Sequence, residues 1–199
     1  MFTGIIEDTG IVKMLKTEGE NLHISIACKF LNELKIDQSI AHNGVCLTVV
    51  DITNEYYTVT AIKETLIKSN LGLLKVNDLV NLERSMLANM RIDGHFVQGH
   101  VDQTATCASI KEADGSWYFK FEYTAMQPDY ITVEKGSVCV NGVSLTVVNS
   151  NPDSFEVAII PYTYQHTNFQ RFTKGSTVNL EFDVLGKYIA KILRQQLGK

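Results

Sequence analysis

The chain has 199 residues, of which 45% are hydrophobic and 20% are charged, and a formal net charge of −4. This composition is typical of a globular protein, and the negative charge argues against a nucleic-acid partner, which normally needs a basic stripe. No apolar run is long enough to span a bilayer, and the acidic N-terminal stretch does not resemble a secretory signal. The four cysteines form no Cys-x-x-Cys pair and are expected to be reduced thiols, so we expect a cytoplasmic protein without a membrane partner.

Most of the chain has the pattern of short β-strands, rich in β-branched and aromatic residues. In chain order, the strand-like stretches are 22–28, 45–52, 56–62, 116–123, 143–149 and 155–160. Brief helices are expected at 29–34, 64–72, near 126–134 and at 162–169. Asn43-Gly44 and Asn141-Gly142 interrupt similar runs and are expected to form tight turns or bulges, because Asn-Gly tolerates positive φ. Many short, closely spaced strands predict a small antiparallel barrel in each half.

The last residues, 186–199, have the pattern of an amphipathic helix. Ile189, Ile192, Leu193 and Leu197 fall on one face at helical spacing. This face either packs against its own barrel or forms a seam between subunits, and the sequence favours neither arrangement.

The chain contains an internal repeat. Residues 39–50 (SIAHNGVCLTVV) and 137–148 (SVCVNGVSLTVV) share eight of twelve positions at an offset of 98, and VNLE recurs at 80–83 and 178–181. Nearer the start, Gly4 and Ile6 match Gly99 and Val101 at an offset of 95. A repeat of this length predicts two units with the same fold, and a ligand bound by one copy is expected to have a counterpart in the other.

Five motifs in a fixed order carry a resemblance to a known family: MFTGIIEDTG, NGVCLTV, DGHFVQGHVD (93–102), NGVSLTV and VNLEFDVLGKY. Together they resemble riboflavin synthase of the alpha type, from Met1 to about Lys191. The resemblance implies an all-β fold with two tandem six-stranded antiparallel Greek-key barrels, 1–93 and 94–186, followed by a C-terminal helix, 187–199. Members of this family form homotrimers through that helix.

The resemblance also implies an activity. The family enzyme is a transferase that converts two molecules of 6,7-dimethyl-8-ribityllumazine into riboflavin and 5-amino-6-ribitylaminouracil by moving a four-carbon unit. Each barrel is expected to hold one lumazine, and the reacting pair is expected to meet between the N-terminal barrel of one subunit and the C-terminal barrel of a neighbour. No metal or organic cofactor is expected, because the lumazine ring itself acidifies its methyl group and accepts a nucleophile, which leaves binding, orientation and proton transfer to the protein.

The implied substrate contacts fall into two matched sets. The set assigned to the first copy consists of Gly4, Ile5, Ile6, Cys46, Leu47, Thr48, Thr60, Ala61, Ile62, Lys63, Glu64 and Thr65. The set assigned to the second copy consists of Gly99, His100, Val101, Ser144, Leu145, Thr146, Ile160, Pro161, Tyr162, Thr163, Tyr164 and Gln165. Lys135 is expected to reach a ligand in another subunit, and Phe2 is expected to supply an aromatic face beside a ring.

Three residues are expected to be catalytic. By the resemblance, Ser39 and Cys46 match positions that activate, or stand near, the nucleophile that adds to the acceptor lumazine. His100 suits proton transfer because its charge changes near neutral pH. The two lumazines must be treated differently, so the positions where the copies differ, Cys46 against Ser144 and Ile5 against His100, are the most informative about chemistry.

Each assignment has a structural alternative. Cys46 alone has the pattern of a small buried hydrophobic residue, His100 that of a structural histidine, and the threonines that of ordinary strand residues. A metal site formed by His95 and His100 is disfavoured because no cysteine or spaced carboxylate completes a ligand set. His95 is therefore left outside the catalytic set.

Two other functional classes compete with the synthase. Lumazine proteins and related fluorescent proteins share this fold and bind lumazine or flavin without turnover, but here the motif positions, Lys135 and Ser144 included, are intact. Asp93-Gly94 departs from the Gly-Gly of many relatives, outside the expected chemistry. A flavin reductase module would need a nicotinamide-binding βαβ unit with a glycine-rich turn, which the sequence lacks.

Overall fold

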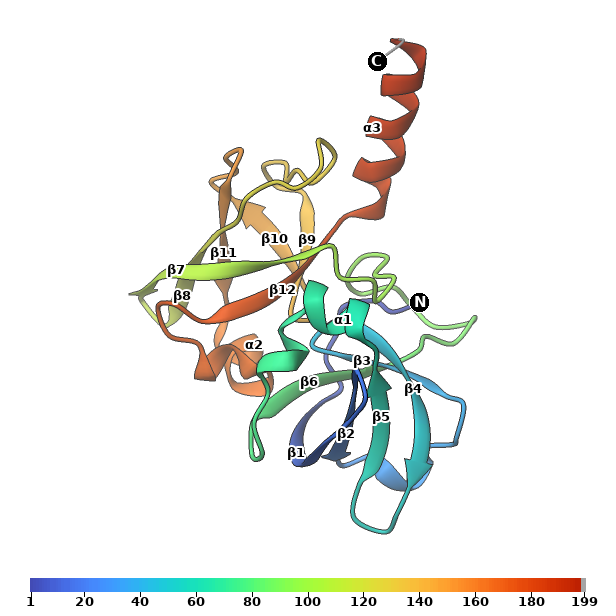
Figure 1. Cartoon of the computed structure of the whole chain (residues 1–199). Coiled ribbons are helices and arrows are strands. Elements are labelled where there is room, and N and C mark those ends of the chain that lie inside the picture. Colours follow the sequence, from blue (N-terminus) through green and yellow to red (C-terminus); the bar gives the residue numbers. More distant parts are fainter. Residues whose placement is uncertain (198–199) are drawn as a thin grey trace.

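Two closed β-barrels lie side by side, and a C-terminal helix stands away from them (Figure 1). This computed structural model describes residues 1–197. The N-barrel consists of β1 (Asp8–Glu18), β2 (Asn21–Ala27), β3 (Ser39–His42), β4 (Val45–Ile52), β5 (Tyr57–Ala61) and β6 (Leu79–Arg84). The C-barrel consists of β7 (Gln103–Ala113), β8 (Ser116–Glu122), β9 (Ser137–Val140), β10 (Val143–Val148), β11 (Ser154–Ile159) and β12 (Thr177–Phe182).

Both barrels have the same antiparallel topology. The strand order is β1-β2-β5-β4-β3-β6 in the first barrel, and it is β7-β8-β11-β10-β9-β12 in the second. In each, three strands joined in sequence are followed by a fourth that returns beside the first of them, so β6 lies against β3 and β12 against β9. This is a Greek-key arrangement, which confirms the predicted fold class.

The predicted strands are confirmed, and β4 coincides with the stretch 45–52. Alternation explains this agreement, because Val45, Leu47 and Val49 of β4 face the core while the residues between them face outward. The other short helices are also found, as brief α-helices or 3₁₀-helices: η1 (Leu31–Glu33), α1 (Lys63–Lys68), η2 (Asn70–Leu73), α2 (Pro161–His166) and η3 (Asn168–Arg171).

The prediction of a helix near 126–134 is wrong. The segment forms turns, with one backbone hydrogen bond of 3.0 Å from Tyr130 N to Gln127 O. Pro128 has no N–H to donate, and the β-branched run 131–133 disfavours a helix. The ring of Tyr130 stacks on Phe182 with centroids 5.3 Å apart, which ties this segment to the C-barrel.

The two barrel interiors differ in composition. Branched aliphatic residues dominate the N-barrel core, whereas five phenylalanines fill the C-barrel core: Phe119, Phe121, Phe155, Phe169 and Phe182. The N-barrel core also contains a buried polar pair, in which His42 Nε2 lies 2.7 Å from the Tyr57 hydroxyl and His42 Nδ1 lies 3.0 Å from the Ile40 carbonyl. At the offset of 98, the matching residues in the C-barrel are Val140 and Phe155.

The buried His42 makes the N-barrel sensitive to acid. Burial lowers the pKa of His42 to about 4, from 6.5, so the unfolded chain binds the proton more tightly between these values. The folded N-barrel therefore keeps its full stability above pH 6.5, where His42 is neutral in both the folded and the unfolded chain, and it loses stability as the pH falls toward 4.

Between pH 7.5 and pH 5 we expect the protonation of His42 in the unfolded chain to lower the free energy of unfolding by about 2 kcal/mol. The double variant His42→Val/Tyr57→Phe copies the C-barrel pair and should lack this component in urea titrations at the two pH values. An equal acid loss in both proteins would contradict the assignment.

The C-terminal helix α3 (Val184–Gln196) is capped at its N-terminus by Asp183, whose side chain accepts a hydrogen bond from Leu185 N. Ion pairs of Lys187 with Asp102 and of Arg194 with Asp129 tie it to the C-barrel. Its apolar residues, Leu185, Tyr188, Ile189, Ile192 and Leu193, are each at least half exposed. Packing of this face against its own barrel, one of the two arrangements considered, is therefore wrong. No helix within residues 1–197 is both long enough and apolar enough to cross a membrane.

The two barrels contact each other at their Asn-Gly turns. Asn43-Gly44 and Asn141-Gly142 each have two positive φ values, as expected for two-residue hairpin turns. A Cβ atom on Gly44 would lie 2.8 Å from Gly142 N, and one on Gly142 would lie 2.8 Å from Gly44 N. These turns are thus an interface between the barrels as well as local turns, whereas the sequence alone predicted only the turns.

Buried asparagines join the barrels across this contact. Asn81 Nδ2 donates to the Asn141 carbonyl at 2.9 Å, and Asn179 Nδ2 donates to the Asn43 carbonyl at 2.9 Å. Asn81 and Asn179 are the asparagines of the two VNLE motifs. Two further asparagines stand just after the short α-helices. Asn168 N donates to Asn81 Oδ1 at 2.7 Å, and Asn70 N donates to Asn179 Oδ1 at 2.6 Å. The interface is therefore a buried polar network with approximate two-fold symmetry, in which Asn70 Oδ1 has no hydrogen-bond partner within residues 1–197.

Candidate active site

The segments that lead into the two barrels are exchanged. Phe2 and Val97 pair as an antiparallel bridge between the barrels, with N–O distances of 2.8 and 3.1 Å. Beyond the bridge, the Gly4 carbonyl accepts a hydrogen bond from Ser144 N in the C-barrel, and the Gly99 carbonyl accepts one from Cys46 N in the N-barrel, both at 2.8 Å. Each segment thus lies against the barrel that it does not lead into.

This exchange corrects the predicted grouping of residues. From the repeat, Gly4, Ile5 and Ile6 were expected beside Cys46, and Gly99, His100 and Val101 were expected beside Ser144. The structure does the opposite: Ile6 packs on the C-barrel core and Val101 on the N-barrel core. Repeat alignment pairs residues by their order along the chain, and it carries no information about which barrel a leading segment contacts.

The N-barrel site is formed where the segment 99–101 meets β4 and α1. A cavity of about 230 Å³ there is lined by Val45, Cys46, Glu64, Thr65, Lys68, Ser69, Gly99, His100 and Val101. Ser39 and Thr48 lie directly opposite each other on the outward face of the β3–β4 hairpin that also carries Cys46. Of the three residues expected to be catalytic, Cys46 and His100 line this cavity, and Ser39 lies outside its lining on the same hairpin as Cys46.

Cys46 is half-buried and outward-facing, so it is not a core residue of the barrel. The other predicted contacts of this copy are more dispersed. Leu47 and Ala61 point into the core, and the Thr60 hydroxyl lies 2.9 Å from His23 Nδ1. Ile62 is exposed at the start of α1, and Lys63 forms an ion pair with Glu20.

The matching C-barrel site lies where the segment 4–6 meets β10, since the Gly4 carbonyl accepts a hydrogen bond from Ser144 N and Ile6 packs on the C-barrel core. Ser144 and Thr146 lie on β10, Thr163 is on α2, and Ile5 in the segment 4–6 is exposed. Around this group, Leu145 packs on the core, Tyr164 stacks on Trp117 and Tyr162 stacks on His166. Ile160, Pro161, Gln165 and Lys135 are exposed.

His95 lies at the C-barrel site, although it was not among the residues expected to be catalytic. Its Nδ1 lies 2.6 Å from Ser144 Oγ, and burial lowers its pKa while Asp183 opposes that shift. Gly94 permits this approach, because a Cβ there would lie 2.8 Å from Ser144 Cβ. Its position in the motif 93–102 was the signal that it lies near a ligand site.

Phe2 does not present the aromatic face that was predicted. It is fully buried between the barrels, with Ala41, Val97 and Cys139 around it and Cys46 at the edge of the cluster. A Cβ on Gly99 would lie 2.8 Å from the Phe2 ring, so the ring supports the segment that lines the N-barrel site from beneath.

Two buried glutamates, which sequence reasoning missed, hold the exchanged segments. Glu83 of β6 accepts hydrogen bonds from Thr3 N at 2.6 Å, Thr3 Oγ1 at 2.8 Å and Gly4 N at 2.9 Å. Glu181 of β12 accepts from Gln98 N at 2.5 Å and from Gly99 N and His100 N at 2.9 Å each. The signal was present in the sequence, because these are the glutamates of the repeated VNLE motif.

Burial raises the pKa of both carboxyl groups against the effect of these N–H groups. For Glu181 the pKa rises to about 7, with Lys187 lowering it and Asp102 raising it. For Glu83 the pKa is also raised, and Glu7 contributes in the same direction. The hydrogen bonds therefore offset only part of the cost of burying each charge.

A larger cavity lies elsewhere. It has a volume of about 640 Å³ and is lined by the inter-barrel asparagines together with η2 and η3. None of the predicted site residues lines it. The smaller cavity beside Cys46 and His100 is the better candidate, since chemistry needs reactive side chains as well as space. Within residues 1–197, no group of three His, Cys, Asp or Glu side chains is arranged to hold a metal ion.

Comparison with known proteins identifies the family. Residues 3–85 and 98–183 each match the lumazine binding domain. The riboflavin synthase of Actinobacillus pleuropneumoniae is 44% identical over 194 residues, which cover 97% of this chain and 90% of the relative. The riboflavin synthase of Bacillus subtilis (strain 168) is 42% identical over 198 residues, covering 98% and 91%.

The chain belongs to the riboflavin synthase family. Its activity is that of a riboflavin synthase, a transferase that forms riboflavin from two lumazine molecules, as the resemblance implied.

Solved structures support the fold. LumP complexed with riboflavin superposes with a TM-score of 0.84 at 23% identity, covering 92% of this chain and 99% of that chain. LumP complexed with 6,7-dimethyl-8-(1'-D-ribityl) lumazine gives a TM-score of 0.82 at 22% identity, with the same coverage. At this identity the likeness establishes the fold alone, and the riboflavin synthases are much closer in sequence.

Proposed function

We propose that the N-barrel site of one subunit and the C-barrel site of a neighbouring subunit each bind one 6,7-dimethyl-8-ribityllumazine, and that the two rings react face to face in a homotrimer. The observation that carries this proposal is the pair of matched sites built from the same elements but with different reactive groups. Dismutation uses one substrate twice, so two related sites are suited to bind it. Riboflavin is released as the product.

The difference between the sites supports separate roles for them. The N-barrel site has the Cys46 thiol and the His100 imidazole, and the C-barrel site has the Ser144 hydroxyl paired with His95. One lumazine must lose a proton from its 7-methyl group, whereas the other must accept a nucleophile on its ring. We assign Ser39 and Cys46 to the addition step and His100 to proton transfer.

Most of the rate enhancement would come from holding the two rings together. Orientation of two reactants converts a bimolecular step into an effectively unimolecular one. We propose that backbone groups at Gly4 and Gly99 contact the pyrimidine edges, where the absence of a side chain permits close approach. The hydroxyls of Thr48, Thr65, Thr146 and Thr163 are suited to the ring oxygens and ribityl chains.

The exposed face of α3 supports the trimer. Tyr188, Ile189 and Ile192 are each at least half exposed on a helix that extends beyond the barrels (Figure 1). A terminal apolar stripe of this kind needs a partner, and other subunits would supply it. In such an assembly, exposed Lys135 reaches the ligand of a neighbour. We also propose that the protein works in the cytoplasm, where thiols such as Cys46 stay reduced.

The trimer model predicts the effect of charge on α3. The variant Ile189→Asp/Ile192→Asp should form smaller oligomers and lose on the order of a hundredfold in turnover, because the two rings no longer meet in the required geometry. Each chain should still bind about two lumazines, since both barrels remain intact. Light scattering after gel filtration, riboflavin absorbance and calorimetry measure these quantities. Deletion of residues 187–199 should have the same effects on oligomer size and turnover. The variant Gln195→Asp, at an exposed polar position of the same helix, is the control and should change neither. A monomeric variant with full activity would rule out a reaction between subunits.

A further inference from the structure

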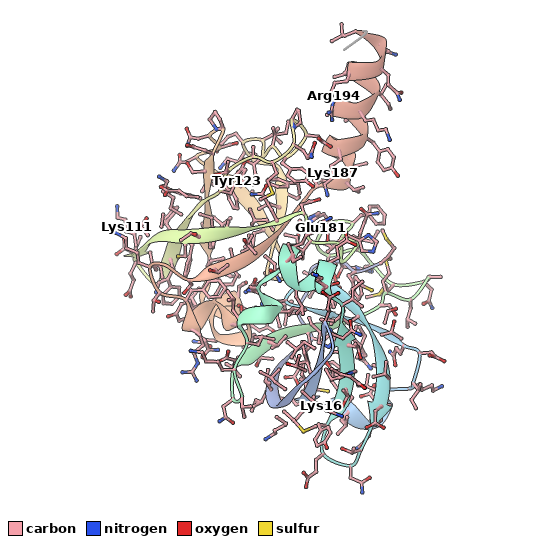
Figure 2. All side chains as sticks on the ribbon, in the orientation of Figure 1. Lys16, Lys111, Tyr123, Glu181, Lys187 and Arg194 are labelled. Carbon is pink, nitrogen blue, oxygen red and sulfur yellow. The ribbon has the colours of Figure 1, made fainter. Side chains whose placement is uncertain are left out.

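The two buried glutamates connect each site with the opposite barrel. Glu181 stands on the last strand of the C-barrel, near the middle of the molecule in Figure 2, yet the segment that it holds lines the N-barrel site. Glu83 stands on the last strand of the N-barrel, yet the segment that it holds lies against Ser144 of the C-barrel.

A single glycine links the two ends of each connection. Gly99 N donates to Glu181 at 2.9 Å, while the carbonyl of the same residue accepts from Cys46 N at 2.8 Å. Gly4 N donates to Glu83 at 2.9 Å, and its carbonyl accepts from Ser144 N at 2.8 Å. The segments are packed tightly, since a Cβ on Gly99 would lie 2.6 Å from Cys46 Cβ and one on Gly4 would lie 2.6 Å from Ser144 Cβ. A shift of either segment would therefore change the width of the site that it lines.

Only a carboxylate satisfies this arrangement. Glu181 uses one oxygen for Gln98 N and the other for Gly99 N and His100 N, and a glutamine would turn an NH₂ group toward one of these donors. Glu181 is 2% exposed and Glu83 is 4% exposed. Within residues 1–197, neither forms an ion pair with a Lys, Arg or His side chain within 4.0 Å, so their hydrogen bonds go to these segments.

We propose that Glu181 and Glu83 are positioning residues that act across the barrel interface, so that Glu181 sets the ligand affinity of the N-barrel site and Glu83 sets that of the C-barrel site. Glu181 also fixes the backbone of His100, a residue assigned to proton transfer, whereas the matching Ile5 N–H has no such bond to Glu83 among the described residues. The inference rests on the proposed function, because it takes both sites to bind lumazine.

The test measures affinity at each site separately. The probe is a 7-oxo-8-ribityllumazine, which lacks the reactive 7-methyl group and cannot turn over. Amide NMR signals of Thr65 and Thr163 in the full chain report on the N-barrel and C-barrel sites, and titrations are made at pH 8, where Glu181 is ionised. Loss of a charge-assisted hydrogen bond is worth about ten- to a hundredfold in affinity. Glu181→Gln should weaken binding by about that factor at Thr65 and by less than about threefold at Thr163, and Glu83→Gln should do the reverse.

The controls separate positioning from general destabilisation. Exposed Glu112→Gln on β7 should leave both affinities unchanged, and Glu181→Asp and Glu83→Asp keep the charge with a shorter reach, so they should show the same crossed pattern at smaller size. If a Gln variant does not fold, the Asp variants decide the question. Equal weakening at both sites, or weakening only in the variant's own barrel, would overturn the inference. A wild-type protein that binds the probe at neither site would overturn the proposed function instead.

Discussion

His100→Gln is expected to lower kcat by about a hundredfold with little change in lumazine affinity, since removal of a positioned acid–base group costs on the order of 10²–10⁴ in rate. His100 lines the cavity beside Cys46 and Thr65, and Glu181 holds its backbone. No hydrogen bond to its ring is made by the part of the chain that the structure describes, in contrast to the rings of His42 and His95. This leaves the imidazole open to a bound lumazine, in keeping with the proton-transfer role proposed for His100.

The same experiment tests the asymmetry between the two sites. Cys46→Ala should also lower kcat, and Cys46→Ser less so, because serine keeps a hydrogen-bonding group but loses the more acidic thiol. Ser144→Ala, at the matching position, should cost less in rate and more in binding. Steady-state kinetics followed by riboflavin absorbance give kcat and KM, and calorimetry gives affinity. Lower melting temperatures with normal kcat would assign His100 and Cys46 to packing, and equal rate losses at Cys46 and Ser144 would remove the chemical distinction.

The largest loss of stability is expected from Gly44→Ala and Gly142→Ala. Both glycines have φ values above +80°, where an L-residue costs about 1–2 kcal/mol, and the added methyl group would meet the backbone of the opposite turn at 2.8 Å. Overpacking at a rigid contact costs a further 1–3 kcal/mol or so, so we expect a total of roughly 2–5 kcal/mol in urea unfolding.

A third glycine separates the backbone cost of positive φ from the cost of the contact between the barrels. Gly115 follows Asp114 in the turn between β7 and β8 and has φ +82°, but a Cβ on it would meet nothing within 4 Å. Gly115→Ala should therefore show the backbone cost alone. The excess loss in Gly44→Ala measures the contact between the barrels. Equal losses at Gly44 and Gly115 would mean that the turns separate easily and do not constrain the interface.

The local structure of this protein was largely determined by its sequence. Apolar and polar residues alternate along β4, and Asn-Gly pairs sit where both residues need positive φ, so strands and hairpins were predictable from neighbouring residues alone. The repeat implied two barrels of one topology, and the motifs implied the family. The helix expected near 126–134 failed because Tyr130 is held by Phe182, a residue distant in sequence, while Pro128 interrupts the helical hydrogen bonds.

Only the tertiary structure decided how the two copies are connected. Gly4 and Gly99 occupy matching positions, and nothing in their neighbouring residues indicates that each lies against the other copy's barrel. The same holds for the asparagines at the Asn-Gly turns and for Glu83 and Glu181, whose hydrogen-bond partners are distant in sequence or in the opposite copy. A strand pattern reports which face of a residue is buried, because burial follows the alternation of the backbone. It does not report which segment covers that face, because that depends on the packing of the two barrels against each other.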